Sequence, residues 1–307
     1  MVEQVDESVT SLIKSPTHQA MEPEIRRRWK ALEFEYAKRL RECSVQERKS
    51  LYTEAYSAVS ELAVERFKSD RPEDRTAGTS KKTVALISKF VDKNDRVLEV
   101  GSGRGYTCFM LSPQVKSVVG IEVSSSGIKE SRDISAQMGL KNVEFKQISA
   151  TDIAENFGPD SFNICTCIDV LEHLHPEDAK EHLYQAFSIL KPGGRYFIQM
   201  PNRLTGPHDI TKTEFPDAKE ALGFHLNEST YKDVVHLMKA IGFTKFRIVI
   251  WLKTIPWSPK RPIKLFYQIG TTAEFIFRLL PTSLHFSLLE EALAIRLVAY
   301  KPTSPQR

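Results

Sequence analysis

A glycine-rich segment follows an apolar stretch near residue 100, and its composition suits the binding of a cofactor. Residues 97–105 read Val-Leu-Glu-Val-Gly-Ser-Gly-Arg-Gly. Glycines at such a point let the chain turn sharply and approach a ligand closely, because no Cβ intrudes. A helix that begins directly after the loop offers free N–H groups and a positive dipole end. Gly101, Gly103 and Gly105 are therefore candidate binding residues.

The residues around this loop discriminate between two kinds of cofactor. The dinucleotide fingerprint is Gly-x-Gly-x-x-Gly, and here Tyr106 occupies the position of its third glycine. Glu99 would repel a pyrophosphate but could orient the cationic end of an amino acid. Glu122, 21 residues after Gly101, ends a predicted strand and could accept both hydrogen bonds of a ribose diol. Together they favour a cofactor that carries an amino acid; the alternative for Glu122 is an exposed strand-end acid.

Further candidates follow the next two predicted strands. Asp152 could accept a hydrogen bond from an adenine amino group, with Ile153 packing on the ring; the alternative is a helix cap. Asp169 is expected to face the cleft, because ligands bind at the carboxyl ends of the strands in an open parallel sheet. His173 is the titratable group just beyond it. Its alternative role is structural, as a histidine bonded to nearby backbone.

A loop rich in helix breakers, residues 201–209, contains a histidine next to an acid, His208 and Asp209. A neighbouring carboxylate raises the basicity of a histidine. The pair could therefore deprotonate a hydroxyl, and the alternative is a hydrogen-bonded pair that stabilises the loop. His225 is a third, weaker candidate.

The elements that position these residues alternate in type. Strands are predicted at 96–100, 115–122, 143–147, 162–168, 194–200, 246–252 and 294–300. Helices are predicted after the glycine loop and at 126–138, 176–190 and 226–241, the last capped by Asn227. This alternation predicts an α/β fold, a doubly wound, mostly parallel sheet with helices on both faces. Residues 1–20 are expected to be disordered, 21–78 to form an N-terminal helical cap, and 79–307 to form the main domain.

These segments, in this order, resemble the class I (Rossmann-like) S-adenosylmethionine-dependent methyltransferases, particularly those that act on small molecules. The resemblance is close over Thr79–Met200 and includes Leu171-Glu172-His173 and a Leu-Lys-Pro-Gly-Gly turn at 190–194. It implies a seven-stranded sheet with an antiparallel last strand, and S-adenosyl-L-methionine as cofactor.

The resemblance also implies a role for each strand end. The glycine loop holds the methionine part of the cofactor, the second strand the ribose and the third the adenine, while the segment after the fourth strand passes the methionine end. For the glycine loop the matching residues are Glu99, Gly101, Ser102, Gly103 and Gly105. Glu122 and Val123 match the ribose position, and Asp152 and Ile153 match the adenine position. Ile168 and Asp169 match the segment that passes the methionine end.

The function expected is methyl transfer to a small, hydrophobic metabolite, at oxygen rather than nitrogen or carbon because of the histidines. A dinucleotide-dependent oxidoreductase and a non-catalytic cofactor-binding module are the alternatives. A nucleic-acid or protein methyltransferase is a further alternative. Its amino-methylating nucleic-acid classes are disfavoured, because Asp169-Val170-Leu171-Glu172 stands where an Asn/Asp-Pro-Pro-Tyr motif would be.

One long stretch departs from the family pattern. Residues 253–293 are expected to form a helical lid inserted before the last strand. Within it, 262–281 is apolar, and the alternative to a packed lid is a binding surface for a hydrophobic substrate, a second subunit or a membrane. The oligomeric state stays open.

Composition sets the remaining limits. The 307 residues are 41% hydrophobic and carry a net charge of +4, too small an excess to indicate a nucleic-acid partner. The four cysteines are too few and scattered for a disulfide scaffold and lack zinc-ligand spacing, so we predict no metal site and a reducing, cytoplasmic compartment. Neither a signal peptide nor a membrane span is expected.

Overall fold

The structure is a computed structural model that describes residues 23–67, 81–250, 263–279 and 292–303. The tail predicted to be disordered, 1–20, lies outside the described residues, as do parts of the predicted insertion, 253–262 and 280–291.

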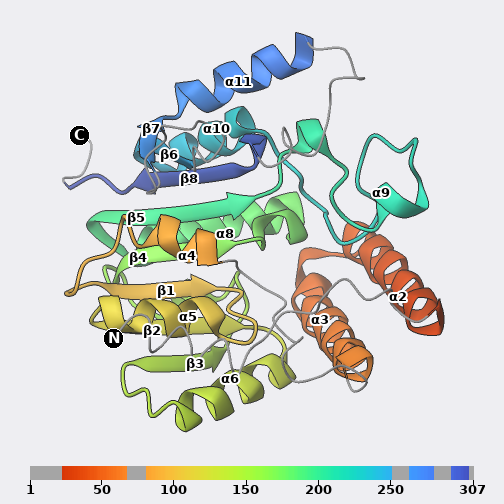
Figure 1. Cartoon of the computed structure of the whole chain (residues 1–307), viewed down its shortest axis with the longest axis horizontal. Coiled ribbons are helices and arrows are strands. Elements are labelled where there is room, and N and C mark those ends of the chain that lie inside the picture. Colours follow the sequence, from red (N-terminus) through yellow and green to blue (C-terminus); the bar gives the residue numbers. More distant parts are fainter. Residues whose placement is uncertain (1–22, 68–80, 251–262, 280–291, 304–307) are drawn as a thin grey trace.

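A central β-sheet organises the molecule (Figure 1). Its strands are β1 (Arg96–Val100), β2 (Ser117–Glu122), β3 (Val143–Gln147), β4 (Phe162–Ile168), β5 (Leu190–Met200), β6 (Thr244–Ile250), β7 (Ile263–Phe266) and β8 (Ile295–Tyr300). They lie in the order β3-β2-β1-β4-β5-β8-β6-β7. The first five run parallel, and β8 runs antiparallel to β5 and β6. The predicted α/β class and the antiparallel last strand are confirmed.

The predicted number of strands is wrong, because the described residues form eight strands instead of seven. The extra strand is β7, from a segment expected to be helical. It pairs antiparallel with β6, from Ile250↔Ile263 to Arg247↔Phe266. This pairing satisfies backbone groups at an edge of β6 that would otherwise be unpaired.

Helices cover both faces of the sheet. One face carries α4 (Lys81–Ile87), α5 (Tyr106–Leu111) and α6 (Ser125–Gln137), and the other carries α7 (Ile153–Asn156), α8 (Pro176–Ile189) and α10 (Tyr231–Ile241). Successive strand residues point to opposite layers, so Val97 belongs to the core under α5 and Leu98 to the core under α8. Both side chains are fully buried.

The start of α10 differs from the predicted cap at Asn227. The helix begins at Tyr231, because Thr230 and Asp233 form a reciprocal capping box. The preceding residues are held as a loop, in which Asn227 N donates to Glu172 O at 2.9 Å and Ser229 bridges to Asn202. This loop fixes the segment that contains Glu228.

The N-terminal helices form a separate layer. They are α2 (Pro23–Glu42) and α3 (Val45–Phe67), and they lie beyond the carboxyl ends of the parallel strands, next to the short helix α9 (Thr211–Glu214) (Figure 1). Arg41 connects this layer to the long loop after β5, since its guanidinium donates to the carbonyls of Ala221, Leu222 and Gly223.

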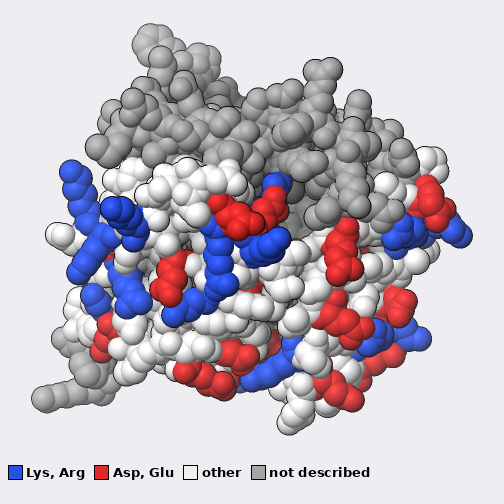
Figure 2. Space-filling model, turned by 90° about the horizontal axis from the view of Figure 1, so that it is seen from below, with Lys and Arg blue, Asp and Glu red and all other residues white. Residues whose placement is uncertain are grey.

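The surface is mixed in charge and locally apolar. Figure 2 shows basic and acidic side chains intermingled on one face. Helix α11 (Gln268–Leu279) exposes Ile269, Phe275, Ile276 and Leu279. No helix among the described residues is long and apolar enough to cross a membrane.

Candidate active site

A cleft opens where β1, β2 and β4 end. It encloses about 680 Å³ of atom-free space, its open mouth included. The strand order reverses between β1 and β4, the place where ligands bind in doubly wound sheets. Its lining comprises Tyr52, Tyr56, Val100, Gly101, Ile121, Glu122, Val123, Ile148, Ser149, Ala150, Asp169, Val170, His173 and Leu174.

The glycine loop needs its glycines for different reasons. Gly101, with φ +68°, lines the cleft, and a Cβ there would lie 2.3 Å from Val170 Cγ2. Gly103, with φ +50°, has no atom within 4 Å of where a Cβ would be, so its left-handed backbone alone requires glycine. A Cβ on Gly105 would collide with Phe145 and Phe109. Gly105 therefore serves the packing of the loop against β3 and α5.

Glu122 closes one side of the cleft. Its Oε1 accepts the backbone N–H groups of Val123 (2.8 Å) and Ser124 (3.0 Å), and its Oε2 accepts that of Gly103 (3.1 Å). A carboxylate has about four acceptor positions. One position therefore stays open for a ribose hydroxyl, where the sequence suggested two.

The side chains of four predicted cofactor residues are buried instead of lining the cleft. Ile153 and Ile168 are buried, in the layers under α8 and α5 respectively. Glu99 is also buried, and its Oε2 accepts the thiol of Cys108 at 2.8 Å. Burial raises the pKa of Glu99 to about 7, and the Cys108 contact offsets only part of that rise. Ser102 is buried below the loop, and its Oγ has no hydrogen-bond partner.

Two predicted acids remain at or near the cleft. Asp169 is exposed at its rim with φ +50°, a conformation uncommon outside glycine that Asp tolerates, and Gln199 Nε2 donates to its Oδ2 at 3.2 Å. Asp152 lies in a neighbouring depression that shares Val123 and Ser149 with the cleft, and it pairs with Lys49 at 2.5 Å.

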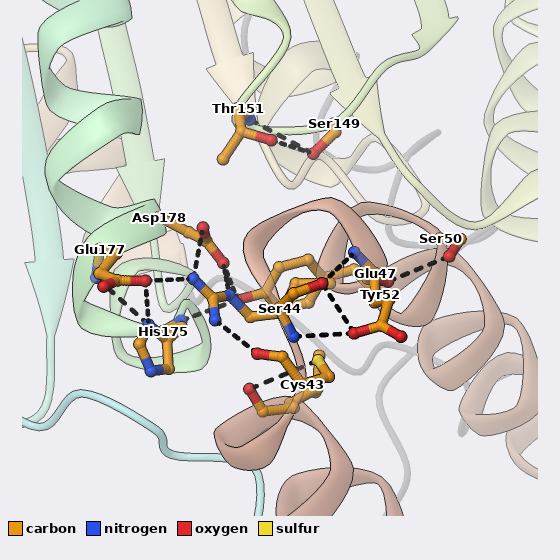
Figure 3. A network of polar contacts seen from close by, with 12 residues as sticks. Cys43, Ser44, Glu47, Ser50, Tyr52, Ser149, Thr151, His175, Glu177 and Asp178 are labelled. Carbon is orange, nitrogen blue, oxygen red and sulfur yellow. Dashed lines mark hydrogen bonds and ion pairs between the residues drawn. The ribbon is translucent and has the colours of Figure 1, made fainter.

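Helix α3 supplies two aromatic residues to the cleft that the sequence did not indicate, Tyr52 and Tyr56. The Tyr52 hydroxyl donates to Asp178 Oδ2 (2.9 Å) and accepts the backbone N–H of His175 (2.7 Å), as Figure 3 shows. Arg48, one turn earlier, donates to the same Asp178 oxygen at 2.7 Å, and both of these side chains are buried. The ion pair thus anchors α3 to α8 and holds the tyrosines at the strand ends.

A second cavity adjoins the cleft and shares Tyr56 and His173 with it. It encloses about 1140 Å³ of atom-free space, mouth included. Its walls come from α2, α3 and the loops after β4 and β5. The lining comprises Arg26, Trp29, Glu33, Tyr56, Val59, His173, His208, Asp209, Ile210, Phe224 and His225. All three predicted catalytic residues, His173, His208 and Asp209, therefore meet in one cavity.

The predicted pairing of His208 with Asp209 is wrong. Asp209 accepts backbone N–H groups from Thr211 (2.9 Å) and His225 (3.3 Å), so it stabilises the loop. The carboxylate beside His208 is Glu228, whose Oε1 lies 3.4 Å from His208 Nδ1 and accepts the His208 backbone N–H at 2.7 Å. His208 Nε2 contacts the hydroxyl of Thr205 at 3.0 Å.

Glu228 also joins a second histidine to this group. His225 Nδ1 lies 2.7 Å from the same Oε1. Burial alone would raise the pKa of Glu228, but the two histidines beside it hold that pKa at about 2. The carboxylate is therefore charged at neutral pH.

His173 lies where the two cavities meet. Its Nδ1 is 3.2 Å from the carbonyl of Phe224, and its ring meets that of His225 nearly at right angles, with centroids 4.8 Å apart. Burial, assisted by His225, lowers the pKa of His173 to about 3, so its imidazole is neutral at physiological pH.

Several residues that line or support the two cavities carry only weak signals in the sequence. Tyr52 and Tyr56 stand one turn apart on a helix, a spacing that ordinary core aromatics share. Glu228 precedes the Thr230 cap and resembles a helix-start acid. Glu172 stands inside the Leu171-Glu172-His173 segment, where the adjacent His173 gives the stronger signal.

Comparison with known proteins identifies the family. A model of the methyltransferase domain family matches residues 91–247, which is about half of the chain and contains most of the cleft. An uncharacterized methyltransferase, YcgJ of Bacillus subtilis, is 25% identical over 154 residues, covering 45% of this chain and 58% of YcgJ. A ubiquinone biosynthesis O-methyltransferase of Pseudomonas fluorescens is 32% identical over 108 residues, covering 35% of this chain and 45% of that protein. The chain thus spans about half the length of the curated relatives it matches.

Solved structures with similar folds include two methyltransferase-related proteins. The crystal structure of YcgJ aligns with a TM-score of 0.47 at 19% identity, over 72% of this chain and 98% of that one. A phosphoethanolamine N-methyltransferase of Haemonchus contortus, in complex with S-adenosyl-L-methionine, aligns with a TM-score of 0.48 at 17% identity, over 71% and 52%. The family match confirms the predicted family and its cofactor, S-adenosyl-L-methionine. This chain belongs to the class I S-adenosylmethionine-dependent methyltransferases.

Proposed function

We propose that this protein transfers a methyl group from S-adenosylmethionine to a hydroxyl oxygen of a small, apolar or aromatic acceptor. One observation carries the proposal: three histidines converge in a cavity that adjoins the cofactor cleft and shares Tyr56 and His173 with it. An oxygen nucleophile needs a proton acceptor, whereas a neutral amine needs none for the attack itself. A cavity rich in imidazoles suits the first chemistry better.

The donor groups of the cleft fit the cofactor. The open acceptor position of Glu122 suits a ribose hydroxyl, and Asp169 at the rim suits the ammonium of the methionine part. Val123, Ile148 and Val170 give apolar walls against which an adenine can pack. When bound, the cofactor supplies a methyl group on a sulfonium, whose carbon–sulfur bond breaks with its electrons going to sulfur as the carbon–oxygen bond forms.

The second cavity holds and orients the acceptor. Trp29, Tyr56 and Phe224 line it, and Tyr56 stacks on Phe224 with ring centroids 5.6 Å apart. Rigid aromatic walls suit a flat or hydrophobic molecule. Holding the hydroxyl in line with the methyl group accounts for much of the rate in such transfers.

His208 is the proposed proton acceptor. Glu228 is charged, and its Oε1 lies 3.4 Å from His208 Nδ1 without a hydrogen bond in this structure, so it stabilises the imidazole once that ring is protonated. The hydroxyl proton passes to His208 as the oxygen bonds to carbon. The other nitrogen, Nε2, takes the proton, and the acceptor hydroxyl then replaces the Thr205 hydroxyl that contacts it at 3.0 Å.

The similarity to ubiquinone biosynthesis O-methyltransferases supports transfer to oxygen on a ring-bearing acceptor, at 32% identity over a limited segment. The test is incubation with methyl-labelled S-adenosylmethionine and matched acceptors, catechol and 1,2-diaminobenzene, beside a metabolite extract. We expect label in methyl ethers. Label found only in methylamines would overturn the assignment to oxygen.

A further inference from the structure

A group of side chains at the junction of the two cavities has the composition of a metal site. Glu172, His173 and His225 each place one potential ligand atom within 4.8 Å of the other two. Glu172 and His173 belong to the 3₁₀ turn at Leu171–His173 after β4, while His225 comes from the loop before α10. Residues about fifty positions apart therefore converge on one point.

Both histidines have one ring nitrogen fixed by an acceptor. His173 Nδ1 lies 3.2 Å from the carbonyl of Phe224, and a carbonyl can only accept, so Nδ1 carries the proton. His225 Nδ1 lies 2.7 Å from the Glu228 carboxylate, which imposes the same tautomer. In each neutral ring the lone pair is then on Nε2. Metal-binding histidines are held in this way, with the second nitrogen donating to a carbonyl or carboxylate.

The carboxylate of Glu172 gives independent support. Its side chain is 1% exposed, and its Oε2 has no hydrogen-bond partner in the structure. A buried carboxylate oxygen left without a partner destabilises a fold, because it loses its water and gains nothing in return. A cation held between Glu172 and the two imidazoles would supply the missing interaction.

We propose that Glu172, His173 and His225 bind a divalent transition-metal ion. Two imidazole nitrogens and one carboxylate oxygen suit Mn²⁺, Fe²⁺, Co²⁺ or Zn²⁺. Three protein ligands leave coordination positions open, the arrangement of catalytic rather than structural sites. His182 provides a contrast: it is fully buried, and both of its nitrogens are engaged, by Ala150 O and the Tyr196 hydroxyl, so it has no lone pair to offer.

The position of the site indicates its task, and this part rests on the proposed function. His173 lines both cavities and His225 lines the acceptor cavity, so the open positions face the acceptor. An acceptor oxygen bound there would be held beside the methyl donor and would lose its proton more readily. The proton goes to His208, and the oxygen lone pair then forms the bond to the methyl carbon.

Metal binding can be measured without any activity. After treatment with EDTA and its removal, the full chain is titrated calorimetrically with Mn²⁺, Co²⁺ and Zn²⁺ in turn. We expect one site per chain, with affinity lowered by on the order of 100-fold or more in Glu172→Gln and His225→Ala. Glu228→Gln, which acts only through His225, should lower it about 10- to 100-fold. His236→Ala, at an exposed histidine of α10, should bind as the wild type does.

The proposal is overturned if none of the three ions binds the wild type, or if Glu172→Gln and His225→Ala bind as tightly as His236→Ala. Circular dichroism checks that each variant is folded. Pulsed electron paramagnetic resonance of the Mn²⁺-loaded wild type provides a measurement that needs no variant: it should show coupling to two histidine nitrogens, and its absence would contradict the assignment. An active enzyme that binds no ion would overturn this inference alone, whereas an inactive protein that binds the ion would overturn only the proposed function.

Discussion

The cofactor cleft and the second cavity, which is the proposed acceptor site, adjoin each other, but they are assembled from different lengths of chain. Most of the cleft comes from residues 100–174, in which each strand end contributes one short motif. The acceptor cavity combines α2, α3 and the loops around His208 and His225, which lie up to about two hundred residues apart. The cleft can therefore be predicted from local sequence motifs, whereas the second cavity forms only when the N-terminal helices pack against the loops after β4 and β5.

The two regions also differ in electrostatics. The cleft exposes carboxylates at Glu122 and Asp169, suited to hydroxyl and ammonium donors. The cavity has aromatic walls around imidazoles that are oriented by the buried Glu228. The difference suggests that cofactor binding and proton transfer can be disabled separately.

The largest effect on turnover alone, without a loss of cofactor binding, is expected at His208. His208→Gln removes the proposed proton acceptor, so turnover should fall by about 10²- to 10⁴-fold, the usual contribution of such a group. Turnover with methyl-labelled cofactor measures this, with His236→Gln as a control at an exposed site. Turnover equal to that of the control would remove His208 from the mechanism.

The largest effect on stability is expected at the buried Arg48–Asp178 ion pair, which anchors α3 to α8. Arg48→Met leaves Asp178 buried without its charged partner and with only the Tyr52 hydroxyl beside it, which should lower the free energy of unfolding by about 3–5 kcal/mol. Arg39→Met is the matched control, because its pair with Glu54 is exposed and should contribute far less to stability. Urea denaturation compares the two. Equal losses would mean that the buried pair does not hold α3 in place.

The buried acid beneath the glycine loop should make stability depend on pH. The pKa of Glu99 is raised to about 7 from 4.5, so the folded state binds more protons than the unfolded state between these values. Stability should therefore fall as the pH rises through this window, by up to about 3 kcal/mol in total. Glu99→Gln should lack this component in urea denaturations at pH 5 and pH 8. The same decline in both proteins would show that Glu99 is not its source.

A smaller effect is expected at Glu122. Glu122→Gln weakens the contacts to Gly103, Val123 and Ser124, and it replaces the charged acceptor for the ribose. We expect cofactor affinity to fall about 10-fold, or roughly 1.4 kcal/mol. Glu144→Gln, at an exposed acid on the neighbouring β3, is the control and should leave affinity unchanged.

Sequence patterns were sufficient for the sheet and for the position of the cleft, since alternating burial and glycine turns are local properties. The same patterns did not predict the strand β7, because four residues at a sheet edge give little periodicity. They also paired His208 with its neighbour in sequence, Asp209, although its partner in space is Glu228, twenty residues later. Glu99 was expected in the cleft because position along a strand does not reveal which layer a side chain faces.

In the proposed function, the cleft binds the cofactor and the adjoining cavity moves the proton. Calorimetric titration of S-adenosylmethionine into the wild type, Glu122→Gln and His208→Gln tests it most directly. We expect binding to the wild type, weaker binding to Glu122→Gln and unchanged binding to His208→Gln. No binding to the wild type, or the same loss of affinity in both variants, would contradict the proposed function.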